Sequence, residues 1–249
     1  MLVTPQAPVR GLRRADLLTD DPAGAAAFWS DLFGWVVLTP LGQELACWVG
    51  ERQVATCRRP GPGERPGWHV VFGGARGEHG SLTGPAGAVA GHDPGRVRHG
   101  PWAPAPRHGE PCWVELRVAD GPDAQACDGF WAGELGWEVR AGGVDGSHEP
   151  RAVYWLEERA VTGRAAPGPW QAGHPGAGWM CFFAVTDLDV AARRCAELGG
   201  QVMGAPAEAA LGRVCVVADP GGAVCTLVER PRGWGGALQV RDGSALGVR

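Results

Sequence analysis

Two carboxylates occupy matching places in the two halves of the sequence, with a spacing suited to proton transfer. Asp16 follows Arg14, and Glu115 follows Trp113, each two residues further along a segment that we expect to be a strand. Side chains two apart on a strand share a face. A carboxylate on a mostly apolar wall can act as a general acid or base. The alternative is a carboxylate at the rim of such a wall, paired with Arg14 or Arg117.

A histidine and an arginine extend this candidate chemistry. His69, next to Trp68, is expected to be a metal ligand or a general base, or else a histidine of the core or of a loop. Arg14 can clamp a carboxylate or phenolate, or else pair at the surface with Asp16 or Glu51.

Other histidines fall in long loops. His148 and Glu149 lie on the enlarged loop of residues 141–151, where gating residues often occur, although a solvated loop explains them equally well. A loose cluster, which is either a poor metal site or plain loop composition, comprises His79, His92, His99 and His108.

Aromatic residues suggest the kind of ligand. Most of the 12 tryptophans are expected to pack in the core, but Trp102, Trp170 and Trp234 fall in Pro/Gly-rich segments. Those three could line the mouth of a site for a flat aromatic molecule. Tyr154 is the only tyrosine, so it is the single candidate for tyrosine acid/base chemistry.

Composition excludes several function classes. The chain has no lysine, so Schiff-base catalysis and a Walker lysine are excluded. A net charge of −4 gives no general attraction to nucleic acids or anionic membranes. We see no apolar run of about 18 residues and no signal peptide. The eight cysteines lack a C-x-x-C pair and read as buried thiols of a cytoplasmic protein, with a metal or redox site as the alternative.

An internal repeat indicates what must position these residues. Residues 20–35 (DDPAGAAAFWSDLFGW) and 122–137 (PDAQACDGFWAGELGW) share a pattern, and Trp48 and Trp68 recur as Trp155 and Trp179. A repeat of this length indicates two copies of one domain. We expect domains at residues 8–109 and 110–232 and a loose tail at 233–249.

Each domain is expected to hold two β-α-β-β-β units in an α+β fold. In the first unit, Asp20-Asp21-Pro22 opens the helix and Gly34 ends it. Its strands are predicted at residues 12–18, 35–39, 44–49 and 53–58. The third unit repeats this pattern from 112 to 164. The fourth unit is predicted as a strand at 180–185, a helix at 187–198, and strands at 201–203, 213–218 and 223–229. The second unit is eroded: only the strand at 70–72 is clear, and residues 73–109 are expected to be partly irregular.

These units resemble the vicinal oxygen chelate superfamily, which includes glyoxalase I, bleomycin-resistance proteins and extradiol dioxygenases. The resemblance rests on the signature T-x-D-P-x-x-A-x-x-F-[YW]-x-x-L-F-G-W at residues 19–35, and on segments 113–137, 179–200 and 212–229. The two-domain form is similar to the group described as hydroxylase-like in actinobacteria. The resemblance implies that the two units of each domain curl into a half-open barrel around a metal.

The resemblance also implies where metal ligands would lie, on the first and last strands of each unit. Those positions fall on Arg14, Trp113, Met180 and Thr226, which are poor ligands, and on His69, which is a competent one. A divalent metal (Zn or Fe) is therefore implied at His69 alone. Its strand partner would come from the stretch that contains His92 and His99.

Together these observations lead us to expect an enzyme that acts on a hydrophobic, aromatic, polyketide-like molecule by acid/base chemistry, such as cyclisation, dehydration or isomerisation. The expected catalytic groups are Glu115, Asp16 and His69. The expected ligand-binding residues are Arg14, Trp68, Trp102, Trp113, Tyr154, Met180 and Thr226. Alternatives are a protein that sequesters an antibiotic and a metal-dependent enzyme. We expect a monomer or homodimer with no nucleic-acid or membrane partner.

Overall fold

The structure, a computed structural model, describes residues 10–39, 44–74, 78–141, 151–168, 176–236 and 238. Trp170, His148 with Glu149, and residues 239–249 of the predicted tail lie outside the described residues. In the described part, no helix is long and apolar enough to cross a membrane.

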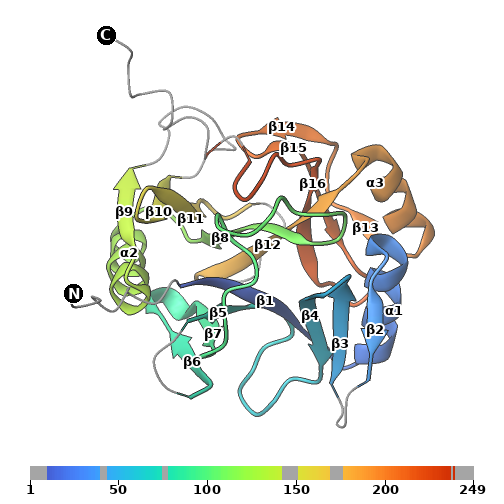
Figure 1. Cartoon of the computed structure of the whole chain (residues 1–249), viewed down its shortest axis with the longest axis horizontal. Helices are drawn as coiled ribbons and strands as arrows, with labels where there is room; N and C mark the ends of the chain where they lie inside the picture. The colour runs from blue at the N-terminus through green and yellow to red at the C-terminus, as the bar shows by residue number, and fades with distance from the viewer. Residues whose placement is uncertain are drawn as a thin grey trace, which may run out of the picture.

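The first half of the chain forms one seven-stranded sheet, in the order β2-β3-β4-β1-β5-β7-β6 (Figure 1). Its elements are β1 (Gly11–Leu18), α1 (Pro22–Phe33), β2 (Val36–Leu38), β3 (Leu45–Val49), β4 (Arg52–Arg58), β5 (Gly67–Gly73), β6 (Gly80–Thr83), the 3-10 turn η1 (Pro85–Gly87) and β7 (Val89–His92). The first strands of the two units, β1 and β5, pair antiparallel at the centre. The eroded unit thus keeps three strands. The strands β6 and β7 were not predicted, because their Gly-rich segments lack an apolar alternation.

The second half forms a second sheet on the same plan. Its strand order is β13-β15-β16-β12-β8-β11-β10-β9, with β14 paired to β15. Its elements are β8 (Pro111–Arg117), α2 (Pro122–Leu135), β9 (Glu138–Ala141), β10 (Ala152–Leu156), β11 (Arg159–Ala165), β12 (Gly178–Val185), α3 (Leu188–Glu197), β13 (Gln201–Val202), β14 (Ala207–Ala209), β15 (Gly212–Ala218) and β16 (Val224–Glu229). Again the first strands, β8 and β12, pair antiparallel. The units therefore pair in chain order, which the sequence alone leaves open.

Local sequence explains the helix boundaries. The Asp21 side chain accepts a hydrogen bond from the Gly24 N–H at 3.0 Å, and Pro22 begins α1. Gly34 ends the helix with φ of 69°, a left-handed conformation that favours glycine. The aromatic face of α1 is buried, so its position is set by packing against the sheet.

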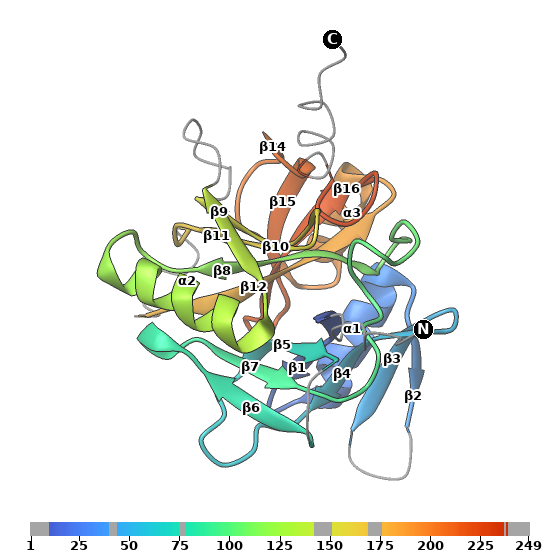
Figure 2. The same ribbon diagram turned by 60° about the vertical axis from the view of Figure 1, so that its left-hand side comes forward.

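The two sheets pack against each other through one shared aromatic core (Figures 1 and 2). Phe183 of β12 lies 5.2 Å, ring centroid to centroid, from Trp68 of β5. Phe72 of β5 lies 5.3 Å from Trp179 of β12. Alternate residues of a strand point to opposite faces. His69 in the first sheet and Met180 in the second therefore lie on the opposite faces of their sheets, and Met180 is itself buried there, at 4% exposure. The predicted boundary between residues 109 and 110 stays a prediction, because one core joins both sheets.

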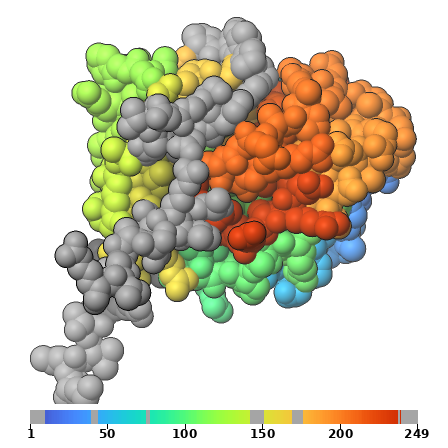
Figure 3. Space-filling model, turned by 90° about the horizontal axis from the view of Figure 1, so that it is seen from above, coloured from blue at the N-terminus to red at the C-terminus, as the bar shows by residue number. Residues whose placement is uncertain are grey.

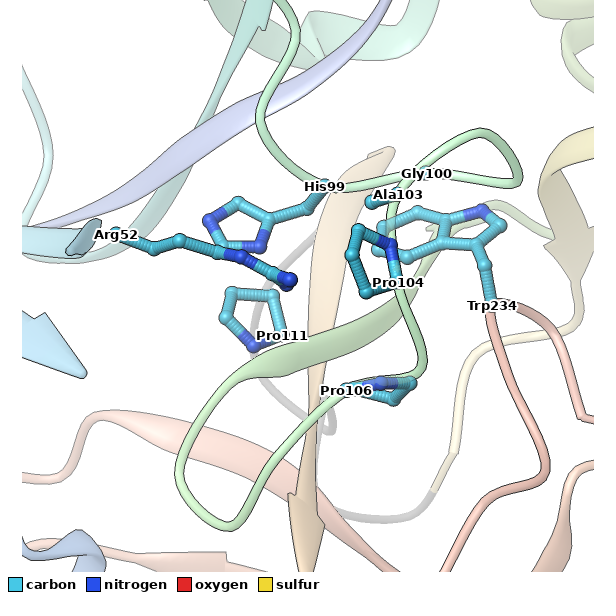
Figure 4. A pocket seen from close by; sticks show the side chains of 8 residues that line it. All are labelled: Arg52, His99, Gly100, Ala103, Pro104, Pro106, Pro111 and Trp234. Carbon is cyan, nitrogen blue, oxygen red and sulfur yellow. The ribbon is translucent and has the colours of Figure 1, made fainter. Parts of the chain in front are cut away.

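A buried histidine lies where the chain passes from one sheet to the other. His99 is 2% exposed, and its Nε2 lies 3.3 Å from the Gln53 carbonyl oxygen. It borders a cavity of about 10 Å³, room for about one water molecule, with Arg52, Pro104 and Trp234 also on the walls (Figure 4). Burial lowers the pKa of His99 to about 4. The folded protein therefore keeps this imidazole neutral.

This burial predicts a specific loss of stability in acid. In the unfolded chain His99 takes up a proton below its ordinary pKa of 6.5, whereas in the folded chain it does so only near pH 4. The free energy of unfolding therefore decreases as the pH falls from 6.5 to 4. Between pH 6.5 and 4, the free energy of unfolding should fall less for His99→Gln than for the unmodified protein. The two decreases should differ by up to about 3 kcal/mol. Urea unfolding at several pH values measures this difference. Parallel pH dependences for the two proteins would contradict it.

Candidate functional site

The outward face of the second sheet gathers four of the predicted site residues. In the β8–β12 register, Trp113 lies opposite Phe182 and Glu115 opposite Met180. Phe182 in turn lies opposite Thr226 of β16. Directly opposed residues share a face. We call the set Trp113, Glu115, Arg117, Met180, Phe182 and Thr226 the outer face of the second sheet. Apart from Arg117, each of these residues is at most 4% exposed, so the face is covered in this structure.

Glu115 is the buried charge at the centre of this face. It is 4% exposed, and its Oε1 accepts a hydrogen bond from Trp113 Nε1 at 3.1 Å. Its Oε2 lies 2.5 Å from Arg117 Nη2, with the arginine side chain 14% exposed. The pairing with Arg117 that the sequence offered as an alternative is therefore formed. The pair does not lie at an exposed rim, because both side chains are largely buried.

Two polar atoms on the same face lack a protein partner. Thr226 Oγ1 and Arg117 Nε are buried and make no hydrogen bond within the described residues. Buried polar groups are almost always hydrogen-bonded, so such an atom is available to water or to a ligand. A buried ion pair also contributes little to stability compared with apolar packing. The polar character of this floor therefore suits recognition better than it suits folding.

Trp234 covers one end of this face. Its ring lies 5.9 Å from that of Trp113, centroid to centroid. Its Nε1 donates to the Val161 carbonyl at 3.0 Å, and the Gly235 N–H donates to the Cys112 carbonyl at 3.0 Å. Figure 3 shows the molecule from the side of the second sheet. The predicted mouth residue Trp234 therefore takes up space that an aromatic ligand on Trp113 would need.

The outward face of the first sheet holds the other two predicted catalytic groups. Asp16 lies opposite His69 in the β1–β5 register. Both Asp16 oxygens accept hydrogen bonds from Arg14, at 2.7 and 3.2 Å. The His69 Nε2 lies 2.7 Å from the Arg65 carbonyl. The structure thus brings Asp16 and His69 together and separates them from Glu115, which lies on the opposite side of the double sheet.

Asp93, which the sequence did not single out, contacts several charged side chains of the first sheet. Its Oδ2 lies 3.1 Å from Arg13 Nε, 3.2 Å from Arg14 Nη1 and 3.2 Å from His79 Nδ1. Burial by itself raises the pKa of Asp93, but the Gly95 N–H and the two arginines outweigh it, so that the pKa lies below its usual value. The loop position of Asp93 gave no signal of this role.

Three predicted ligand-binding residues lie elsewhere. Trp68 is 8% exposed and packs in the core, because it alternates with His69 along β5. Tyr154 is fully buried, and its hydroxyl donates to Asp128 of α2 at 2.6 Å. Burial, and then this bond, raise the pKa of Tyr154, which makes it a poor acid or base near neutral pH. Trp102 lies 5.8 Å from the Arg159 guanidinium, beside the segment that joins the sheets.

Comparisons with known proteins agree with this architecture. Residues 117–228 match the family model of the glyoxalase-like domain. A manganese(II)-bound glyoxalase from Novosphingobium aromaticivorans superimposes with a TM-score of 0.56 at 16% identity, over 90% of this chain and 85% of that one. The halotolerant catechol dioxygenase BphC gives 0.59 at 14% identity, over 92% and 91%. The chain has the vicinal oxygen chelate fold.

Curated relatives that are similar in sequence include a protein of anthracycline biosynthesis. The anthracycline biosynthesis protein DnrV of Streptomyces peucetius is 36% identical over 122 residues, 49% of this chain. The match spans 42% of DnrV, so it covers less than half of that relative.

The metal positions of the vicinal oxygen chelate fold do not carry a ligand set here. They hold Arg14, Trp113, Met180 and Thr226, none of which offers the imidazole or carboxylate donors that such metals need. His69 is the competent donor, and its Nε2 contacts the Arg65 carbonyl. Among the described residues, no group of three or more His, Cys, Asp or Glu side chains is arranged to hold a metal. The described residues therefore do not fit a metal centre.

This donor set predicts the metal content of the protein. We expect purified, untagged protein to contain far less than one zinc, manganese or iron per chain, because the fold's ligand positions are filled by non-ligating side chains. Mass spectrometry before and after chelator treatment measures this content. One tightly held metal per chain that His69→Ala removes would contradict the prediction.

Proposed function

We propose that this protein binds a hydrophobic, oxygen-bearing aromatic molecule on the outer face of the second sheet and acts on it by proton transfer through Glu115. The observation that carries the proposal is a buried carboxylate among Trp113, Met180 and Phe182, beside two buried polar atoms that have no partner among the described residues. The biological role that fits is tailoring of an aromatic natural product. The similarity to an anthracycline biosynthesis protein supports this role.

Each side chain of the face has a part in this chemistry. Trp113, Met180 and Phe182 supply apolar surface for fused rings. The Glu115 carboxylate takes a proton from a carbon that is conjugated with a ring carbonyl. The electron pair of that C–H bond enters the π system, and the π pair of the carbonyl moves to its oxygen. The unpartnered Arg117 Nε and Thr226 Oγ1 hydrogen-bond that oxygen as negative charge develops. Return of the proton to another atom completes an isomerisation.

One observation favours a second candidate, sequestration of an antibiotic without turnover. Both oxygens of Glu115 already have partners, one in Trp113 and one in Arg117. A carboxylate so engaged can serve as a fixed acceptor for a phenolic hydroxyl. The two candidates share the site and differ only in whether a bound molecule exchanges a proton.

A proton-exchange assay separates the two candidates without the natural substrate. Anthrone, a tricyclic ketone with an acidic methylene, is mixed with protein in deuterium oxide, and the loss of its methylene proton signal is followed by NMR. We expect the protein to accelerate exchange. Glu115→Gln should slow it at least about 100-fold while leaving tryptophan-fluorescence binding of anthrone within about threefold.

Matched variants locate the effect. Glu138→Gln changes an exposed glutamate that pairs with Arg140 on β9, and it should leave exchange unchanged. Equal exchange rates for Glu115→Gln and the unmodified protein would refute the assignment of Glu115. A loss of exchange in Asp16→Asn or His69→Ala instead would move the site to the first sheet. Binding of anthrone without any accelerated exchange would favour sequestration.

A further inference from the structure

A cavity of about 230 Å³ lies between the two halves of the chain, away from both outward faces. It is bordered by β5, β6 and β7 of the first sheet and by the last turn of α2 from the second half (Figure 2). Its walls are Arg10, Phe72, Gly73, Leu82, His92, Glu134 and Leu135. This volume corresponds to about seven or eight water molecules, which suits an organic molecule with one ring.

The cavity lies at the eroded second unit, next to the strands β5, β6 and β7. The other three units each place a helix after their first strand, whereas the described residues between β5 and β6 contain none. The α2 helix partly covers the same sheet face, through the Cys127 thiol on the Pro85 carbonyl and the Trp131 ring against Gly84. Its last turn and the strands leave the cavity between them. The place of the missing helix is thus taken partly by α2 and partly by the cavity.

The floor of the cavity is apolar and ordered. Phe72 is 1% exposed and its ring packs edge-on against Trp137, at 5.2 Å between centroids. Leu82 and Leu135 pack against the same core. A ligand in this cavity would therefore bury an apolar body.

His92 brings an imidazole to this floor. It lies opposite Phe72 in the parallel β5–β7 register and opposite Gly80 in the β6–β7 register. A Cβ at Gly80 would lie 2.3 Å from His92 Nε2, so any other residue there would force the ring to move. The imidazole makes no hydrogen bond or ion pair with any described residue. It is therefore free to bind a ligand.

The charges around the cavity favour an anion. Arg10 is half-buried, and its guanidinium donates to the Glu134 main-chain carbonyl at the end of α2. The other N–H groups of Arg10 have no acceptor within the described part of the chain. The Glu134 side chain belongs to an exposed residue, where solvent screens its charge. One half-buried cation and one free imidazole thus face an apolar floor.

We propose that this cavity is a binding site for a small carboxylic acid with an apolar, single-ring body. The carboxylate would lie between Arg10 and His92, and the ring against Phe72, Leu82 and Leu135. The site is independent of the proposed function, because it shares no residue with the outer face of the second sheet.

The test uses 4-fluorobenzoate as probe and the full chain, with binding followed by fluorine NMR. We expect saturable binding with a Kd on the order of 1 mM. The neutral analogue 4-fluorobenzamide should bind at least about fivefold more weakly, as should the probe to Arg10→Gln. His92→Gln should weaken binding about fivefold.

A pair of glycine variants separates loss of the site from loss of folding. Gly80→Ala should weaken binding about fivefold, as His92→Gln does, because the added methyl group displaces the His92 ring. Gly133→Ala on α2 meets nothing within 4 Å and should leave binding unchanged. The thermal unfolding midpoint of each variant shows whether it is folded. Absence of saturable binding to the unmodified protein, or equal Kd values for benzoate and benzamide, would overturn the proposal. So would unchanged binding in folded Gly80→Ala.

Discussion

The packing of the two sheets through one aromatic core is the constraint on which the rest of the structure depends. The inner faces of both sheets are filled by aromatic packing, with Phe183 against Trp68 and Phe72 against Trp179. Aromatic pairs of this kind contribute both buried area and specific geometry. Because the inner faces are filled, binding chemistry on a sheet can lie only on the two outward faces or in a gap left by imperfect packing.

The two outward faces have diverged in character. On the first sheet, Asp93 and Asp16 bind Arg13, Arg14 and His79 in a network that satisfies most of its charges internally. On the second sheet, the ion pair of Glu115 with Arg117 is set among aromatic and thioether side chains, and two polar atoms have no hydrogen-bond partner in the described part of the chain. A network in which every polar atom has a hydrogen-bond partner stabilises the fold. A network with unpartnered polar atoms can still bind a ligand or water. This difference is the reason to place the proposed chemistry on the second sheet.

Much of this arrangement could be predicted from the sequence, because the repeat carries it. The F-W and G-W landmarks predicted α1 and α2 with their glycine stops, and the period of two predicted that Trp113 and Glu115 share a face. The same period separates Trp68 from His69, so that a shift of one residue decides which of these two side chains faces the core. The sequence does not reveal contacts between distant segments. Three features depend on such contacts: the packing of Trp234 on Trp113, the ion pairs of Asp93 and the cavity beside α2. The strands β6 and β7 were missed because tertiary pairing, rather than local propensity, makes them strands.

The most direct test of the central claim is to locate a bound aromatic ketone in a crystal of the protein soaked with anthrone. The account predicts density for the three rings against Trp113, Met180 and Phe182, the carbonyl oxygen near Arg117 and Thr226, and Trp234 displaced from its place on Trp113. Density on the first sheet beside Asp16 and His69, with the second sheet unchanged, would contradict it.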